Sequence, residues 1–230
     1  MKIAGLQKFS LIEYPGKLSA VVFTQGCNLR CGYCHNPELV DRERFHTLIP
    51  EADVMSFLGE RVGKLDAVTV TGGEPLLHHD LDDFLDKVKR LGYLIKLDTN
   101  GSFPDRLERV IQSGLVDYVA MDIKGPLDRY ESIVRKRIDR DRVLRSIATI
   151  LDSGIDHEFR TTVVGSQLRE GDLMEVGAMV HGARRFFLQG FRPSSKHLDP
   201  DFKGAKSPSQ DELLALKEVV GGYVASCQIR

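Results

Sequence analysis

The stretch from Gly26 to Pro37 reads GCNLRCGYCHNP and holds three of the four cysteines of the chain, Cys27, Cys31 and Cys34. It directly follows Ala20–Thr24, an apolar and β-branched run that predicts a buried strand. Three thiolates on a tight loop at the end of a strand can converge on one metal centre. They cannot form a disulfide framework, because their number is odd and their spacings are too short.

The three thiolates indicate an iron–sulfur cluster rather than a zinc site. A structural zinc site normally has four protein ligands, and no second Cys-x2-Cys or His pair in the sequence is placed to complete one. Thiolates also hold cubane clusters, which contain four irons. Three cysteines leave one iron without a protein ligand, which is the arrangement that an open catalytic site requires.

The rest of the sequence alternates between strand-like and helical patterns. The first strand, Leu18–Thr24, follows an extended segment at Ile3–Phe9, and five more are expected at Ala67–Thr71, Leu94–Asp98, Tyr118–Asp122, His157–Val164 and Arg185–Gln189. Helices are expected at Pro50–Lys64, Leu81–Leu91, Pro104–Ser113, Arg140–Asp152, Leu173–Val180 and Ser209–Ala225. Six strands with crossover segments predict an α/β fold with a mainly parallel sheet. Six units are too few for the eight-unit barrel, which takes about 250 residues.

Length and composition set further limits. The chain has 230 residues, with 32 basic and 33 acidic side chains and a net charge of −1. We expect a single domain, residues 1–230, because this length buries one sizeable core. The balanced charge predicts binding of neither nucleic acid nor a membrane. Without an apolar signal segment or a membrane-length run, and with clustered cysteines, the sequence predicts a soluble cytoplasmic protein in a reducing compartment.

Polar segments of unusual composition follow the next three predicted strands. They are Gly72-Gly73-Glu74-Pro75, Asp98-Thr99-Asn100-Gly101 and Asp122-Ile123-Lys124. In a parallel α/β barrel the active site lies at the C-terminal ends of the strands. We therefore expect these segments and the cysteine loop to meet in one site.

The C-x3-C-x2-C spacing, with the aromatic Tyr33 before the last cysteine, resembles the signature of the radical S-adenosylmethionine (SAM) superfamily. The longer run Gln25–Pro37, ending in Cys34-His35-Asn36-Pro37, resembles the glycyl-radical-enzyme activases. Within these it is most similar to the compact anaerobic ribonucleotide reductase activating proteins. The resemblance implies an open (βα)6 partial TIM barrel. It also implies a [4Fe–4S] cluster on Cys27, Cys31 and Cys34, with the amino and carboxylate groups of SAM on the fourth iron.

The glycine-rich segment after the second strand resembles the GGEP motif of the superfamily, whose backbone and acidic residue meet the amino group of SAM. In this chain the matching residues are Gly72, Gly73 and Glu74. Glycines permit close backbone approach, and a carboxylate can hydrogen-bond an ammonium group. The alternative is an ordinary turn whose glutamate is solvated.

The segments after the third and fourth strands resemble those that help to hold SAM in the activases. The resemblance assigns this role to Asp98, Thr99, Asn100, Asp122 and Lys124. It also suggests that Asp98 and Asp122 bind a monovalent cation, for which hard oxygen ligands are suited. The alternative is that the two aspartates pair with Lys124 or with Arg160.

Arg160 lies in a strand that is otherwise suited to burial, where an unpaired charge would be costly. We expect it to point into the barrel mouth and to meet an anion such as the SAM carboxylate, with a structural ion pair as the alternative.

The segment Phe191–Ser207 is long for a connector, which indicates either disorder or a functional loop. Its His197 loosely matches a histidine of the activases that approaches SAM, and a surface histidine is the alternative. Tyr33 and His35 are expected to pack near the adenine. Cys227 is expected to be a small buried residue on the C-terminal helix rather than a ligand.

These features predict an activase that reductively cleaves SAM. A 5′-deoxyadenosyl radical would then abstract hydrogen from a glycine of a partner enzyme, of the anaerobic ribonucleotide reductase or pyruvate formate-lyase type. An external electron donor such as flavodoxin or ferredoxin is implied. One alternative is a radical SAM enzyme acting on a small molecule, such as a compact deazapurine synthase. Another is a non-catalytic iron–sulfur or zinc-binding module.

Overall fold

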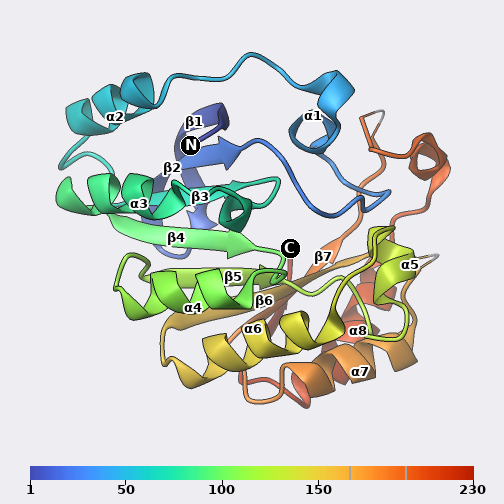
Figure 1. Cartoon of the computed structure of the whole chain (residues 1–230). Coiled ribbons are helices and arrows are strands. Elements are labelled where there is room, and N and C mark those ends of the chain that lie inside the picture. Colours follow the sequence, from blue (N-terminus) through green and yellow to red (C-terminus); the bar gives the residue numbers. More distant parts are fainter. Residues whose placement is uncertain (166, 195) are drawn as a thin grey trace.

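The structure, a computed structural model, describes residues 1–165, 167–194 and 196–230. Over these residues the strands form one mixed sheet of eight, in the order of the chain from β1 to β8 (Figure 1). Neighbouring strands from β2 to β8 are parallel, and β1 adds to the edge of the sheet as the antiparallel partner of β2. The prediction of a mainly parallel, open α/β sheet is confirmed.

The strands are β1 (Ile3–Tyr14), β2 (Lys17–Thr24), β3 (Ala67–Gly72), β4 (Leu94–Thr99), β5 (Tyr118–Asp122), β6 (Asp156–Val163), β7 (Phe186–Gly190) and β8 (Cys227–Ile229). The arrows of β2, β4 and β7 in Figure 1 point toward the same end of the molecule. There the loop after β2, helix α5 and the loop after β7 gather, so the C-terminal ends of the strands and their loops share one edge.

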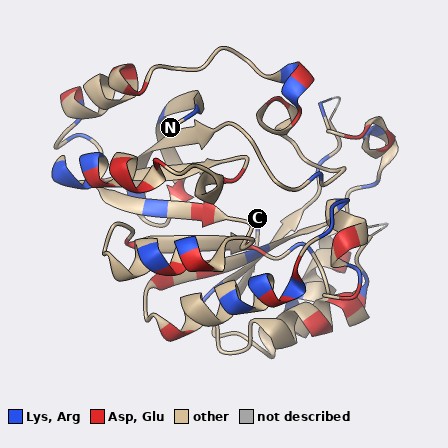
Figure 2. Cartoon of the chain, viewed as in Figure 1, with Lys and Arg blue, Asp and Glu red and all other residues tan. Residues whose placement is uncertain are grey.

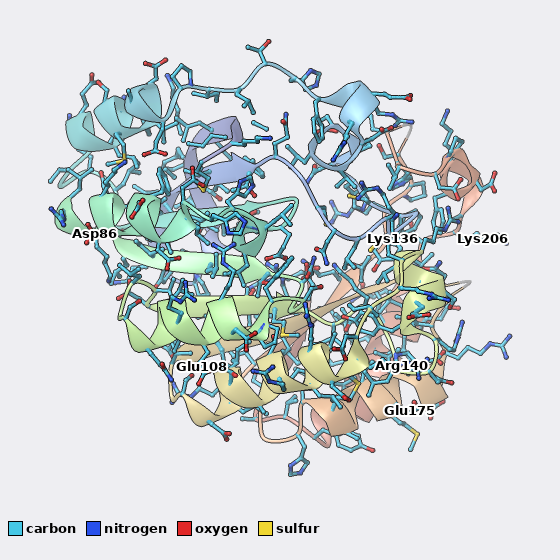
Figure 3. All side chains as sticks on the ribbon, viewed as in Figure 1. Asp86, Glu108, Lys136, Arg140, Glu175 and Lys206 are labelled. Atoms are coloured by element: carbon cyan, nitrogen blue, oxygen red, sulfur yellow. The ribbon has the colours of Figure 1, made fainter. Side chains whose placement is uncertain are left out.

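The α-helices are α1 (Pro37–Val40), α2 (Glu51–Glu60), α3 (Leu81–Arg90), α4 (Pro104–Gln112), α5 (Tyr130–Val134), α6 (Arg140–Asp152), α7 (Glu170–Met179) and α8 (Gln210–Gly221). Three short 3-10 helices are η1 (Arg42–Arg44), η2 (Pro75–Leu77) and η3 (Pro200–Gly204). The longer helices turn charged side chains such as Asp86, Glu108 and Glu175 outward (Figure 3). No helix in the described part of the chain is long and apolar enough to cross a membrane.

The two faces of the sheet differ because side chains alternate along a strand. On β4, Ile95 and Leu97 are buried in the apolar cluster that the helices cover. The residues that alternate with them, Lys96 and Asp98, point to the opposite, inner face and are also buried. Figure 2 shows them as one blue and one red segment on β4. The concave side of the sheet is therefore polar, and its charges are arranged in the interior of the protein.

The C-terminus differs from the prediction. Helix α8 ends at Gly221 instead of continuing to Ala225, because Gly221 and Gly222 are poor helix formers. The chain then forms β8, in which Cys227 pairs with Phe186 of β7. The placement of Cys227 on a helix was therefore wrong, and its side chain is partly exposed rather than buried.

Other element boundaries also moved. β1 runs to Tyr14, past the predicted end at Phe9, because the two strands of the N-terminal hairpin pair up to Tyr14 and Lys17. Helix α2 ends at Glu60, four residues before the predicted Lys64, and Gly63 follows in the left-handed region with φ of +76°. The ends of β3, β4 and β5, which carry the candidate site, lie within one residue of their predicted positions.

Candidate active site

The cysteine loop, residues 25–36, connects β2 to α1, and hydrogen bonds fix its path. Gly26 turns the chain out of β2 with φ of +104°, a conformation that favours glycine. The N–H of Arg30 donates to the carbonyl of Val134, the last residue of helix α5, at 2.9 Å. The guanidinium of Arg30 donates to the carbonyls of Cys27 and Leu29, each at 2.7 Å. The side chain of Arg30 therefore stabilises the conformation of the loop to which it belongs.

The three thiols of this loop are free, Cys31 being buried and Cys27 and Cys34 partly buried. Burial raises the pKa of all three thiols, and that of Cys27 reaches about 12. The N–H of Leu29 donates to the Cys27 sulfur at 3.4 Å and partly opposes this effect. Without a metal these groups are thiols at neutral pH, so metal binding would release protons.

A cavity of about 270 Å³ lies where the cysteine loop meets the ends of β3, β4 and β5. Most of the predicted site residues line it. They are Cys27, Cys31, Tyr33, Cys34, His35, Gly72, Gly73, Asp98, Thr99, Asn100, Asp122 and Lys124. The structure thus brings together residues that are separated by almost 100 positions in the sequence. Three predicted residues, Glu74, Arg160 and His197, do not line the cavity.

Gly72 and Gly73 allow β3 to approach the cysteine loop closely. Gly72 has φ of +128°, and a Cβ there would lie 2.3 Å from the backbone nitrogen of Thr24. A Cβ on Gly73 would lie 2.0 Å from the carbonyl oxygen of Gly26. No side chain larger than hydrogen fits at either position, so these glycines form a close backbone seam beside the cavity.

Glu74 lies beneath this seam and is fully buried. Its carboxylate accepts hydrogen bonds from the N–H of Leu76 at 3.0 Å, the hydroxyl of Thr99 at 2.9 Å and the N–H of Asn100 at 2.7 Å. Burial raises the pKa of Glu74 to about 7 although these three bonds favour the charged form. The solvated turn is therefore excluded, and the carboxylate ties the end of β3 to the end of β4.

Asn100 extends this connection to the cysteine loop. Its amide Nδ2 donates to the Asn28 side-chain oxygen at 2.9 Å and lies 3.9 Å from the Cys27 sulfur. Asn28 was not predicted as a site residue. The pattern C-N-x-x-C gave no signal for it, because this contact depends on the distance between two separate loops.

Arg160 is the centre of a buried ion-pair network on the inner face. Its guanidinium donates to Asp122 at 2.8 Å and to Asp98 at 3.2 Å. Lys96 Nζ lies 2.7 Å from the other oxygen of Asp98, and Lys124 Nζ lies 3.1 Å from Asp122. These are the ion pairs that we considered as the alternative for the aspartates and for Arg160.

The network decides the ionisation of its members. Burial alone would raise the pKa of Asp98, but the charges of Arg160 and Lys96 outweigh burial and hold this pKa below its usual value. For Asp122 the charges of Arg160 and Lys124 likewise outweigh burial and lower the pKa. Both aspartates are therefore charged at neutral pH.

The loop after β7 packs against the cysteine loop. The N–H of Leu198 donates to the carbonyl of Cys34 at 3.2 Å, and that of Asp199 donates to the carbonyl of Gly32 at 3.0 Å. His197 is 2 % exposed, so it is not a surface histidine. Its ring lies 4.7 Å from that of His35, and its Nδ1 has no hydrogen-bond partner among the described residues.

Seven residues that line the cavity were not predicted as site residues: Leu29, Asn36, Val40, Thr71, Pro75, Thr162 and Gln189. Thr162 and Gln189 line the cavity from the ends of β6 and β7. Thr162 follows Arg160 by two positions and so shares its face of the strand, a periodicity that could have found it. Gln189 gave no such signal, because a single polar residue at a strand end is common.

Comparisons with known proteins agree with this geometry. A family model described as the radical SAM superfamily matches residues 21–177. A proposed glycyl-radical enzyme activating enzyme from Methanocaldococcus jannaschii is 32% identical over 234 residues, which cover 99% of this chain and 95% of the relative. The pyruvate formate-lyase-activating enzyme of Clostridium pasteurianum is 34% identical over 129 residues, 54% of this chain and 52% of the relative. A 7-carboxy-7-deazaguanine synthase from Clostridium acetobutylicum is 29% identical over 141 residues, 59% of this chain and 62% of the relative.

Solved structures share the fold at low sequence identity. Streptococcus suis SuiB bound to S-adenosylmethionine superposes with a TM-score of 0.69 and 16% identity over 89% of this chain and 48% of SuiB. TYW1 with a lysine-pyruvate adduct bound gives a TM-score of 0.61 and 16% identity over 90% of this chain and 74% of TYW1. The chain spans about half the length of SuiB and of the pyruvate formate-lyase-activating enzyme.

Proposed function

The chain belongs to the radical SAM superfamily, and from that premise we propose that it activates a glycyl radical enzyme. The observation that carries the proposal is the relative from M. jannaschii, which matches along 99% of this chain. The partial match to a pyruvate formate-lyase-activating enzyme supports the same class of reaction. The partner would be an anaerobic ribonucleotide reductase or an enzyme of the pyruvate formate-lyase type.

The residues present suit both implied groups. Among the described residues, there is no group of three or more His, Cys, Asp or Glu side chains that could hold a single metal ion. A [4Fe–4S] cluster does not need such a site, because each thiolate binds a different iron. Cys27, Cys31 and Cys34 would hold the cluster. Gly72 and Gly73 form a backbone seam on which SAM can lie.

The remaining side chains fit the polar parts of SAM. Glu74 is buried and does not line the cavity, so its carboxylate would support the SAM site by tying the ends of β3 and β4 together rather than by touching the ligand. Lys124 faces the cavity and can meet a carboxylate. Thr99 and Asn100 also line the cavity and supply further polar groups to it. Tyr33 and His35 line the cavity and would border the bound nucleoside, whereas His197 packs against the ring of His35 outside the lining.

When bound, the cluster and SAM would supply a one-electron cleavage that yields methionine and a 5′-deoxyadenosyl radical, the oxidant for the glycine α-carbon. The protein would hold the reacting groups in position and exclude water from them. Arg30 keeps the cysteine loop in shape, and Arg160 fixes Asp98 and Asp122 at the strand ends. These contacts are made entirely by side chains and backbone of the protein, so they would hold the site residues in position for the reaction.

The size of the cavity supports a substrate that enters as part of another protein. Its volume is about 270 Å³, whereas pockets for small ligands commonly hold about 300–1,000 Å³. The cluster and SAM would share this space, because the three cysteines also line it. A second small molecule would find little room, whereas a peptide loop can present one glycine at the mouth and leave its other contacts outside.

A second candidate function is the synthesis of a deazapurine from a small molecule. The match to a 7-carboxy-7-deazaguanine synthase over 59% of this chain favours it. That reaction would require a substrate subsite next to the SAM position. The small cavity disfavours this candidate, which a substrate assay can test directly.

The test is anaerobic. The protein is reconstituted with iron and sulfide, reduced, and incubated with SAM, and 5′-deoxyadenosine is measured with Cys31→Ala as the control. A candidate glycyl radical enzyme is then added, and a protein radical is sought by electron paramagnetic resonance. We expect 5′-deoxyadenosine and a glycyl radical from the wild type only. Formation of a deazapurine from a small molecule, without a protein radical, would establish the second candidate instead.

A further inference from the structure

A second hollow lies against the cysteine loop and is larger than the candidate SAM cavity. Its volume is about 960 Å³, and we call it the outer groove. It is lined by Met1, Lys2, Gln25, Gly26, Cys27, Arg30, Val40, Arg42, Phe45, Leu77, His78, His79 and Asp80. Cys27 and Val40 line both hollows. The cysteine loop is therefore a thin wall between the SAM cavity and the outer groove.

The outer groove is basic although the whole chain is almost neutral, with a net charge of −1. Lys2, Arg30 and Arg42 line it, and the described residues supply no salt bridge to any of the three. The acidic residue of the lining, Asp80, is paired with the N-terminal ammonium of Met1. The outer groove thus carries a local positive charge that the described residues do not neutralise. This charge is complementary to the surface of an acidic partner.

Hydrogen bonds and chain connections link the residues of the outer groove to the cysteine loop. The carbonyl of Lys2 accepts a hydrogen bond from the N–H of Gln25 at 3.0 Å, at the start of the cysteine loop. Arg30 reaches the carbonyl of Cys27 at 2.7 Å. Arg42 belongs to η1, which follows the helix that ends the loop. A partner bound here would be separated from the cluster ligand Cys27 by little more than the loop itself.

The groove also contains half-exposed apolar groups and an unpaired polar atom. Leu77, which is 38% exposed, and the partly exposed Phe45 both line it. The Nε2 atom of His78 is buried and has no hydrogen-bond partner among the described residues. Protein–protein interfaces usually combine apolar side chains with polar and charged ones, as this lining does.

We propose that the outer groove is the docking site of an acidic protein that carries one electron to the cluster. The inference rests on the proposed function, in which each cleavage of SAM consumes one electron. SAM and the hydrogen-donating glycine would occupy the other side of the cysteine loop. The electron must then enter from the groove side, and the carrier is oxidised by one electron as the cluster is reduced by one.

The experiment measures the rate of cluster reduction, not turnover. Reconstituted protein is mixed anaerobically with a reduced acidic ferredoxin, and the loss of cluster absorbance is followed by stopped flow at low and high salt. The test variant is Lys2→Glu/Arg42→Glu, since both side chains are exposed and neither holds the cysteine loop. The control is Arg109→Glu/Lys136→Glu, whose sites are exposed and outside the groove. Both variants change the net charge equally.

We expect the test variant to react with ferredoxin about tenfold or more slowly at low salt, because charge complementarity steers association. The difference should shrink at high salt, where the charges are screened. The control should react like the wild type. All three proteins should be reduced equally fast by photoexcited 5-deazariboflavin, a small uncharged reductant that does not need the groove.

The outcomes separate this proposal from the proposed function. Cleavage of SAM after reduction with 5-deazariboflavin tests the radical SAM chemistry without a carrier protein. If that cleavage occurs but the test variant and the control react equally with ferredoxin, the docking proposal is wrong and the proposed function stands. A change in sedimentation of the test variant with an unchanged reduction rate would make the groove a self-association surface and would also overturn the proposal.

Discussion

The substitution Gly73→Ala tests whether the seam between β3 and the cysteine loop builds the site. The added Cβ would lie 2.0 Å from the Gly26 oxygen, 2.6 Å from the Gly26 carbonyl carbon and 3.2 Å from the Cys27 nitrogen. All three neighbours are backbone atoms, so no side chain can rotate away. Real Cβ contacts are essentially never shorter than 3.0 Å, so the seam must open.

The loss of stability follows from the backbone hydrogen bonds that the opening of the seam would break. The N–H of Gly73 donates to the Thr24 carbonyl at 3.0 Å, and the N–H of Glu74 donates to the Gly26 carbonyl at 2.8 Å. Each such bond contributes about 0.5–1.5 kcal/mol, and overpacking adds about 1–3 kcal/mol. We expect the free energy of unfolding to fall by about 3 kcal/mol. For a chain of this length that lowers Tm by roughly 6–12 °C.

The assay has two readouts. Anaerobic thermal unfolding of the metal-free protein gives the change in Tm, and iron and sulfide are quantified after reconstitution. We expect the variant to retain less iron, because the seam sets the start of the cysteine loop. Gly59→Ala is the matched control, since a Cβ there has no neighbour within 4 Å and the site is in helix α2. It should be stabilised by about 0.5–1 kcal/mol. An unchanged Tm and full iron content for Gly73→Ala would refute the reasoning.

Three further predictions concern the charged network and the cysteines. Arg160→Met should lower the free energy of unfolding by about 1–3 kcal/mol in urea titrations, because buried Asp98 and partly exposed Asp122 lose their shared partner and keep only Lys96 and Lys124. Both aspartates have a folded-state pKa below the ordinary 3.8, so their stabilising contribution is complete above that pH and is lost as the pH falls below it. Asp122→Asn should flatten this acid limb of the stability curve, and an unchanged limb would contradict the assignment. Cys227→Ser should keep the iron content of the wild type and Cys34→Ser should lose it, as measured after reconstitution.

That these segments meet in one site was predictable from the sequence, because the C-terminal ends of parallel strands lie at the same edge of a sheet. Three segments and the cysteine loop were each identified by local composition, and the register places them side by side. Thr24 pairs with Gly72, and Asp122 pairs with Arg160. Local pattern and topology were sufficient for this part of the structure. The roles of these residues toward SAM stay predictions.

The remaining features depend on contacts between distant segments. His197 is buried because the loop after β7 hydrogen-bonds the cysteine loop, and a loop of this composition gave no sign of that packing. Cys227 became part of β8 because a Gly-Gly pair stops α8, whereas the apolar pattern continued to Tyr223. That tyrosine packs against α7 instead, where a Cβ on Gly177 would lie 2.6 Å from its ring.

The ion-pair network bears on the predicted monovalent cation. Asp98 and Asp122 do converge, since both bind the guanidinium of Arg160. However, Lys96 and Lys124 occupy their other oxygens, so three cationic side chains already face two carboxylates. An added cation would have to displace a lysine, and Lys96 is fully buried while Lys124 lines the cavity. Movement of Lys124 toward a ligand carboxylate is therefore the step that would free Asp122 for a cation, and cation binding should require bound SAM.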